Sequence, residues 1–305
     1  MRIIFLGTGG SLPSVGRGLP AVALYRSGEG ILFDCGEGTQ RQLMRSSLSF
    51  MRIERVLISH FHGDHFLGLP GLLQSMAFNG RSEPLSVYGP HGIKRLVETI
   101  GNLGYFPHTF PIRVVEMGDK TEVDCGDYWL RTRAVDHLVP TLAYCLEEKA
   151  RQGKFDVQKA HQLGIPEGPL YRRLQGGKTI TVEGKKIKPE AVVGPPRPGR
   201  KVVYSGDTRP TQAVVDLAMG CDVLIHDATM ESDLERQCFE YGHSTPAQAA
   251  QIAVKSKAKM LFLTHISPRY DEKGKAKRLE DEARAVFPHS VIARDLLEYV
   301  VKYAE

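Results

Sequence analysis

The sequence predicts an α/β fold in which two β-sheets pack within one domain and each sheet carries helices on its outer face. Apolar runs typical of strands alternate with helical segments in both halves of the chain. Two packed sheets accommodate this number of strands better than one very wide sheet. A chain of 305 residues with 42% hydrophobic content can also bury a sizeable core as one domain, residues 1–305.

In the first half of the chain, short apolar runs are interrupted by longer segments with helical spacing. The expected strands are RIIFLG (2–7), AVALY (21–25), GILFDCG (30–36), RVLISH (55–60), LSVYG (85–89), YWLRTRAVDH (128–137) and TLAYCLE (141–147). The expected helices are TQRQLMRS (39–46), GLPGLLQSMAF (68–78) and IKRLVETIGNL (93–103).

In the last third of the chain, strands and helices alternate regularly. The expected strands are KVVYSGDT (201–208), CDVLIHDAT (221–229) and KMLFLTHIS (259–267). The expected helices are TQAVVDLAMG (211–220), TPAQAAQIAVKS (245–256) and RLEDEARAVF (278–287).

Between these two parts, residues 149–201 break the alternation. This segment holds 13 Lys or Arg and 4 Asp or Glu, so its net charge is +9, whereas the rest of the chain carries −4 of the total of +5. It is also dense in glycine and proline, as in GIPEGPLYRRLQGG and VVGPPRPGRK. We therefore expect an inserted, flexible and partly extended basic arm.

Composition excludes several other classes of protein. The five cysteines are scattered and contain no CxxC pair, which argues against a disulfide framework and against a thiolate zinc site. No apolar stretch approaches the roughly 20 residues that span a bilayer, and MRIIFLGTGG does not resemble a secretory leader. We expect a cytoplasmic protein with no membrane partner.

The segment SHFHGDHFLG (59–68) concentrates metal-binding side chains at the end of an apolar strand. On a strand, His60 and His62 would share one face, and the following turn would bring Asp64 and His65 to the same point. Imidazole nitrogens and carboxylate oxygens are usual ligands of zinc. A single histidine of this kind is more often a turn or core residue, but the packed set predicts a site for two neighbouring metal ions.

Three further candidates each follow an apolar strand and open a loop, where residues distant in sequence can assemble into a site: His137, Asp207 and His265. The seven candidates divide into two zinc sites, which gives two Zn ions per chain and makes Asp207 the bridging ligand. The first site would comprise His60, His62 and His137. The second would comprise Asp64, His65 and His265. Manganese or iron would also suit such ligands.

Two residues are candidates for catalysis. Two adjacent cations can make a water nucleophilic near neutral pH, and Asp64 lies where a carboxylate could orient this water and accept its proton. His243 precedes a helix start in GHSTPAQAA. Helix capping alone would explain this segment, but a histidine at a helix N-terminus could also stabilise a phosphate or protonate a departing oxygen.

These motifs resemble those of known proteins. HFHGDH matches the HxHxDH motif of the metallo-β-lactamase superfamily, and His137, Asp207 and His265 resemble its later ligands. FLGTGGSLP, GDTRP, HDAT, GHSTPAQAA, THISPRY and a basic arm carrying EGP resemble the tRNase Z family over essentially the whole chain.

The resemblance implies an αβ/βα four-layer sandwich, the metallo-β-lactamase fold, with an inserted arm. It implies an endoribonuclease that hydrolyses precursor tRNA after the discriminator nucleotide, leaving a 3′-hydroxyl on the tRNA and a 5′-phosphate on the trailer. It also implies that Asp227 orients His243, and that the protein is a homodimer in which the arm of one subunit helps the other to hold tRNA. The arm residues expected to bind tRNA are Gly168, Pro169, Arg172, Arg173 and Lys178.

Two positions depart from the family pattern. Many relatives carry an Arg-Asn pair in the N-terminal loop, whereas Gly18 follows Arg17 here, and Asp227 stands where glutamate is usual. Two alternatives remain: a general phosphodiesterase or other hydrolase of the superfamily, and a noncatalytic RNA-binding module. The basic arm argues against the first alternative, and the complete set of metal ligands argues against the second.

Overall fold

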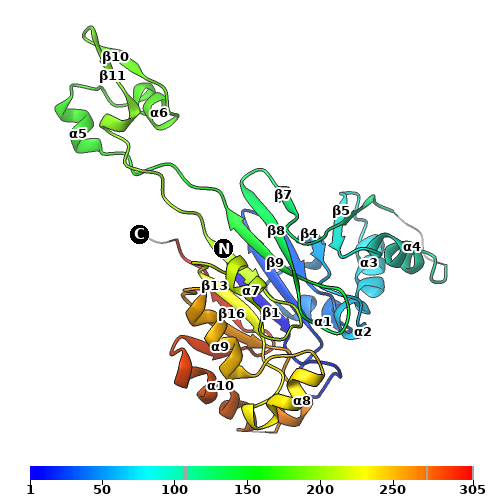
Figure 1. Cartoon of the computed structure of the whole chain (residues 1–305). Helices are drawn as coiled ribbons and strands as arrows, with labels where there is room; N and C mark the ends of the chain where they lie inside the picture. Colours follow the sequence, from blue (N-terminus) through cyan, green and yellow to red (C-terminus); the bar gives the residue numbers. More distant parts are fainter. Residues whose placement is uncertain (106–108, 273, 304–305) are drawn as a thin grey trace. The chain divides into compact units, whose positions relative to one another are not determined.

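The computed structural model describes all residues except 106–108, 273 and 304–305, and it divides into two compact units (Figure 1). The larger unit comprises residues 1–147 and 200–302. The smaller unit comprises residues 148–199 together with Tyr303. None of the described helices combines the length and the apolar character that crossing a bilayer requires.

The first sheet of the larger unit has seven strands. They are β1 (Arg2–Gly7), β2 (Ala21–Arg26), β3 (Glu29–Phe33), β4 (Ile53–Leu57), β5 (Leu85–Gly89), β6 (Ile112–Glu116) and β16 (Glu298–Val300). Their order is β16-β1-β2-β3-β4-β5-β6, and β3 to β6 pair in parallel. The carboxyl ends of these parallel strands therefore meet at one edge of the sheet.

The second sheet also has seven strands. They are β7 (Glu122–Asp124), β8 (Tyr128–Val135), β9 (Thr141–Glu148), β12 (Lys201–Tyr204), β13 (Val223–Asp227), β14 (Leu261–Thr264) and β15 (Ser290–Ile292). Their order is β15-β14-β13-β12-β9-β8-β7, and β12 to β15 pair in parallel. This arrangement again brings several carboxyl ends to one edge.

Helices flank both sheets. Those of the first half are α1 (Thr39–Arg45), α2 (Gly63–Phe66), α3 (Leu69–Phe78) and α4 (Ile93–Gly101), with the 3-10 turn η1 (Phe50–Arg52). Those of the second half are α7 (Gln212–Leu217), α8 (Glu235–Glu240), α9 (Pro246–Lys255) and α10 (Lys275–Val286), with η3 (Ser232–Leu234) and η4 (Pro268–Tyr270). In Figure 1, α9 and α10 lie side by side.

Three apolar layers hold these elements together, because alternate strand residues point to opposite faces. On β1, Ile3 and Phe5 enter the layer between the two sheets, while Ile4 and Leu6 face α1, α3 and α4. A third layer packs β13 and β14 against α7, α9 and α10. The result is the αβ/βα order of layers that the sequence predicted.

The smaller unit folds around a core of its own. Its elements are α5 (Val157–Gln162), α6 (Pro169–Gln175), the hairpin strands β10 (Ile180–Val182) and β11 (Lys185–Ile187), and η2 (Pro189–Ala191). Buried Ala160, Leu174 and Ile180 pack together. The segment expected as a flexible, partly extended arm thus contains regular elements that its glycine and proline content did not predict.

The largest local correction concerns the predicted strand RVLISH. The strand β4 ends at Leu57, so His60 and His62 lie in the following loop and do not share a strand face. The neighbouring strand β3 turns away at Asp34, whose φ is 54°. The carboxylate of Asp34 then accepts the backbone N–H of Ser59 at 2.6 Å, which replaces a ladder hydrogen bond.

Candidate metal centre

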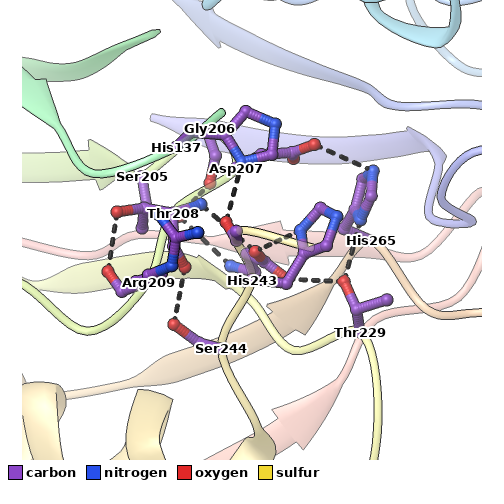
Figure 2. A network of polar contacts seen from close by, with 12 residues as sticks. His137, Ser205, Gly206, Asp207, Thr208, Arg209, Thr229, His243, Ser244 and His265 are labelled. Atoms are coloured by element: carbon purple, nitrogen blue, oxygen red, sulfur yellow. Dashed lines mark hydrogen bonds and ion pairs between the residues drawn. The ribbon is translucent and has the colours of Figure 1, made fainter. Parts of the chain in front are cut away.

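The structure brings together the seven side chains that the sequence proposed as ligands. His60 and His62 lie in the loop after β4, and Asp64 and His65 lie on α2. The other three follow the ends of β8, β12 and β14, and Figure 2 shows them side by side: His137, Asp207 and His265. Their role as metal ligands stays a prediction, but the geometry shows what they can do chemically.

One group of donor atoms forms around His62. The Nε2 atom of His60 lies 3.0 Å from Nδ1 of His62, and Nε2 of His137 lies 3.3 Å from the same Nδ1. Asp207 completes the group, with Oδ2 at 3.7 Å from His60 Nε2. The ligand atoms of these four residues all lie within 4.8 Å of one another.

A second group forms around Asp64. Its Oδ2 atom lies 3.5 Å from Nε2 of His65 and 3.4 Å from Nε2 of His265. The same two imidazole nitrogens lie 3.1 and 3.2 Å from Oδ2 of Asp207. Asp207 therefore contacts both groups, which is the position that a bridging ligand needs.

Contacts behind the first group orient its imidazoles. His137 Nδ1 donates to the backbone oxygen of Gly242 at 2.7 Å. His60 Nδ1 donates to the hydroxyl of Ser59 at 2.9 Å, because that hydroxyl itself donates to Asp34 at 2.8 Å. In both imidazoles the Nε2 atom is left as a lone-pair donor directed at the group.

The second group is oriented in the same way. His65 Nδ1 donates to Asp34 Oδ2 at 2.7 Å. His265 Nδ1 donates to Thr229 Oγ1 at 2.9 Å, and that hydroxyl donates to Asp227 at 2.7 Å. Asp34 is the residue that the sequence analysis missed. The signal was present, since Asp34 also follows an apolar run at a strand end.

This donor set fits divalent cations. The Nε2 atom of His65 is fully buried and, among the described residues, has no hydrogen-bond partner, although the carboxylate of Asp207 lies 3.1 Å away. Several donor atoms converge within the two groups described above. Such an arrangement is unfavourable among neutral imidazoles but matches the nitrogen and oxygen donors that zinc prefers. The cluster therefore indicates a divalent metal site.

Burial and neighbouring charges act together on these groups. Burial lowers the pKa of His60 well below its ordinary value. Burial would also lower the pKa of His65, but the carboxylates of Asp207 and Asp34 outweigh it and raise the value. Burial would raise the pKa of Asp207, yet the adjacent His265 and His65 hold it well below its usual range. The Asp207 carboxylate is therefore ionised and available as a ligand.

His243 lies against Asp227, as the resemblance implied. Its Nδ1 donates to Asp227 Oδ2 at 2.8 Å. Burial would lower the pKa of His243, but Asp227 outweighs it and raises the value to about 9. The helix cap is made by Thr245, whose side chain accepts from Gln248 N. Capping of α9 thus does not occupy His243, although His243 also lies within donor reach of Asp207 and His265.

The N-terminal loop closes one side of the centre. A Cβ atom on Gly10 would overlap the imidazole of His265, so this position requires glycine. The backbone N–H of Ser11 donates to Asp64 Oδ2 at 2.8 Å. Arg17 is buried and donates to Thr8 Oγ1 and to the backbone oxygen of Ala293. Its guanidinium therefore has a structural role within this loop.

The residues expected to bind tRNA belong to the smaller unit. Pro169 begins α6, and Gly168 precedes it with φ of 124°. All five residues are exposed: Gly168, Pro169, Arg172, Arg173 and Lys178.

The four-layer fold and this site define a class of proteins. The model of the beta-lactamase superfamily domain matches residues 191–266, and that of the anti-Pycsar protein Apyc1 matches residues 1–99. The metallo-beta-lactamase fold protein YhfI from Bacillus subtilis superposes with a TM-score of 0.69 at 18% identity, covering 98% of this chain and 99% of that one. The chain has the metallo-β-lactamase fold.

Closer relatives identify the family. The chain is 46% identical to ribonuclease Z of Methanosarcina mazei over 99% of both sequences. It is also 46% identical to ribonuclease Z of Methanothermobacter thermautotrophicus, over 99% of this chain and 97% of the relative. The short form of human tRNase Z superposes with a TM-score of 0.73 at 28% identity, covering 99% of this chain and 100% of that one. The chain therefore belongs to the ribonuclease Z family, which confirms the predicted enzyme class, an endoribonuclease.

Proposed function

We propose that this endoribonuclease is zinc-dependent and removes the 3′ trailer from precursor tRNA. Cleavage after the discriminator nucleotide would leave a 3′-hydroxyl on the tRNA and a 5′-phosphate on the trailer. The observation that carries the proposal is the cluster of five imidazoles and two carboxylates whose donor atoms converge in two groups sharing Asp207. Membership in the ribonuclease Z family supports tRNA as the substrate.

Two zinc ions are proposed for each chain. His60, His62 and His137 would hold one ion, Asp64, His65 and His265 would hold the other, and Asp207 would bridge them. When bound, such a pair of cations supplies activation of a water and neutralisation of phosphate charge. Hydrogen bonds from the Nδ1 atoms of His65, His137 and His265 orient the rings so that their Nε2 atoms face the donor groups.

Asp64 and His243 are proposed as the catalytic residues. Asp64 would orient the attacking water and accept its proton as the new bond to phosphorus forms. The bond between phosphorus and the 3′ oxygen of the discriminator nucleotide then breaks, and the departing oxygen needs a proton. His243 is suited to donate it, or to stabilise charge on the phosphate, because Asp227 holds its ring and favours its protonated form.

The smaller unit is proposed to bind the folded part of the tRNA. Its exposed Arg172, Arg173 and Lys178 would contact phosphates away from the scissile bond, with Gly168 and Pro169 shaping the start of α6. A homodimer and a cytoplasmic location stay predictions from the sequence.

The test compares two substrates in one arm deletion. Residues 153–198 are replaced by a short Gly-Ser linker, and turnover is measured on precursor tRNA and on bis-p-nitrophenyl phosphate. We expect KM for the tRNA to rise far more than kcat falls, whereas hydrolysis of the small phosphodiester largely survives because every proposed ligand is retained. Mapping the cut at single-nucleotide resolution tests the cleavage position.

Intact tRNA processing after the deletion would favour a general phosphodiesterase and contradict the proposed role of the arm. Equal losses on both substrates would mean that the arm supports the catalytic unit and not tRNA binding. Absence of turnover on any phosphodiester by the metal-loaded, full-length protein would contradict the proposed function itself.

A further inference from the structure

Asp295 joins the C-terminal part of the larger unit to its N-terminal loop. It lies between β15 and β16, and its Oδ1 accepts the backbone N–H of Thr8 at 3.1 Å and the hydroxyl of Thr8 at 2.8 Å. Its Oδ2 accepts the backbone N–H of Gly18 at 2.7 Å and the side-chain amide of Gln42 at 2.8 Å. One carboxylate thus receives four hydrogen bonds, three of them from residues 8 and 18.

Residues 8 and 18 are the two ends of a closed loop. The backbone N–H of Gly9 donates to the oxygen of Gly18 at 2.9 Å, so the chain returns to its starting point. Arg17 adds a second tie, because its Nη1 donates to Thr8 Oγ1 at 2.6 Å and to the Ala293 oxygen at 2.7 Å. Asp295 and Arg17 together fix the base of the loop.

Gly10 and Ser11, which lie within this loop, contact the candidate metal centre. Gly10 N donates to the Ile266 oxygen at 3.1 Å, next to His265. Ser11, with φ of 64°, directs its backbone N–H at Asp64 Oδ2, 2.8 Å away. That same oxygen is the one that lies close to His65 and His265. A shift of the loop base would therefore displace the Ser11 N–H and change the orientation of the Asp64 carboxylate.

We propose that Asp295 is a positioning residue for Asp64, acting through residues 8–18. The proposal rests on the proposed function, in which Asp64 is both ligand and catalytic residue. A hydrogen bond from a backbone N–H to a carboxylate is strong enough to fix its orientation, and such outer contacts tune metal sites. Loss of the Asp295 charge would weaken the hold on Thr8 and Gly18, let the loop relax, and move the Ser11 N–H away from Asp64.

The test uses Asp295→Asn, the isosteric Thr8→Val and the control Asp222→Asn. Asp222 also accepts a backbone N–H, that of Lys201 at 2.7 Å, but it directly precedes β13, and its side-chain partners in the described structure, Lys201 and Lys259, lie outside the N-terminal loop. Each full-length variant is loaded with zinc and assayed on bis-p-nitrophenyl phosphate. Metal content is measured, and the cobalt-substituted proteins are compared by visible absorption spectroscopy.

We expect Asp295→Asn to lower kcat roughly 10- to 100-fold while KM and the number of bound metal ions stay close to wild type. Thr8→Val removes the hydroxyl that donates to Asp295 and accepts from Arg17, but it keeps the Asp295 charge and the backbone hydrogen bonds from residues 8 and 18, so it should also lower kcat. The cobalt spectrum should change in both variants, because the orientation of the Asp64 ligand changes. Asp222→Asn should lower the melting temperature without altering kcat or the spectrum.

A wild-type kcat and cobalt spectrum in both Asp295→Asn and Thr8→Val would overturn the proposal, and so would loss of bound metal in Thr8→Val. If the wild-type protein hydrolyses no phosphodiester, the proposed function fails, yet the cobalt spectra still decide whether Asp295 acts on the metal centre.

Discussion

The two units of this protein use ionisable side chains in opposite ways. In the larger unit, His60, His65 and Asp34 are fully buried, and each is held by short polar contacts to its neighbours. In the smaller unit, Arg172, Arg173 and Lys178 are exposed, and they belong to the segment 149–201, whose net charge is +9. Removing a buried group leaves its partners unpaired and disturbs a whole network, whereas removing an exposed one subtracts a single weak contact. The expected effects of substitution follow this difference.

The largest effect is expected for Asp64→Ala. The change removes a proposed ligand together with the group that accepts the proton of the water, so turnover should fall by at least about 10³-fold on every substrate. Rates on precursor tRNA and on bis-p-nitrophenyl phosphate check this. Asp281→Ala, on the surface of α10, serves as the control. A loss confined to the tRNA substrate would place Asp64 in RNA binding.

The next largest effect is expected on the metal content of variants that lack a proposed ligand. His65→Ala or His265→Ala should reduce the zinc bound by the purified protein below about two ions per chain, because an incomplete set of ligands binds weakly. Elemental analysis of the dialysed protein measures this, with His91→Ala as control, since His91 is exposed and pairs only with Glu116 among the described residues. Full occupancy in both variants would contradict the ligand assignment.

His243→Ala should slow RNA cleavage about 10²- to 10³-fold and leave the metal content unchanged, because the side chain acts on charge at the phosphate. Thr245→Ala is the matched control. It removes the cap of α9, which should cost about 1 kcal/mol of stability, and should leave the cleavage rate intact. Loss of metal in His243→Ala would instead make His243 a ligand, a role that its distance to Asp207 and His265 permits.

The smallest effect is expected in the smaller unit. Replacing both Arg172 and Arg173 by alanine should raise KM for precursor tRNA severalfold without changing kcat on the small phosphodiester. The slope of log K against log salt should become shallower by about 1 for each phosphate contact that is lost. Binding measured at several salt concentrations tests this, and an unchanged slope would remove these two arginines from the tRNA interface.

The difference between buried and exposed segments also decides what could be predicted from the sequence. Long apolar strands such as β1 and β9 were recognised, because their burial leaves a continuous apolar signal. The strands β6, β7, β15 and β16 were missed. All four are the outermost strands of their sheets, and all but β6 have only three residues. Tertiary pairing, and not local pattern, makes these segments strands.

At the candidate site, residue types and strand ends together located the seven proposed ligands, but not their backbone. The placement of His60 and His62 on one strand face was wrong, because β4 ends at Leu57, where the turn at Asp34 ends its pairing with β3. Asp34 itself was missed because its importance comes from contacts with residues at distant positions in the chain, such as Tyr204, which donates to it at 2.7 Å. The apolar run before Asp34 marks a strand end, but no local pattern encodes which distant residues its carboxylate contacts.

Asp34 also has a consequence for how the centre fills with metal. Its Oδ2 accepts His65 Nδ1 of the second group and, through the Ser59 hydroxyl, holds His60 of the first. If the two proposed ions bind, the first would hold the histidine of its own group more tightly against Asp34, and the shared carboxylate would in turn restrain the histidine of the other group. We expect the two ions to bind cooperatively, with singly loaded protein scarce during a titration, and expect Asp34→Asn to separate the two binding steps.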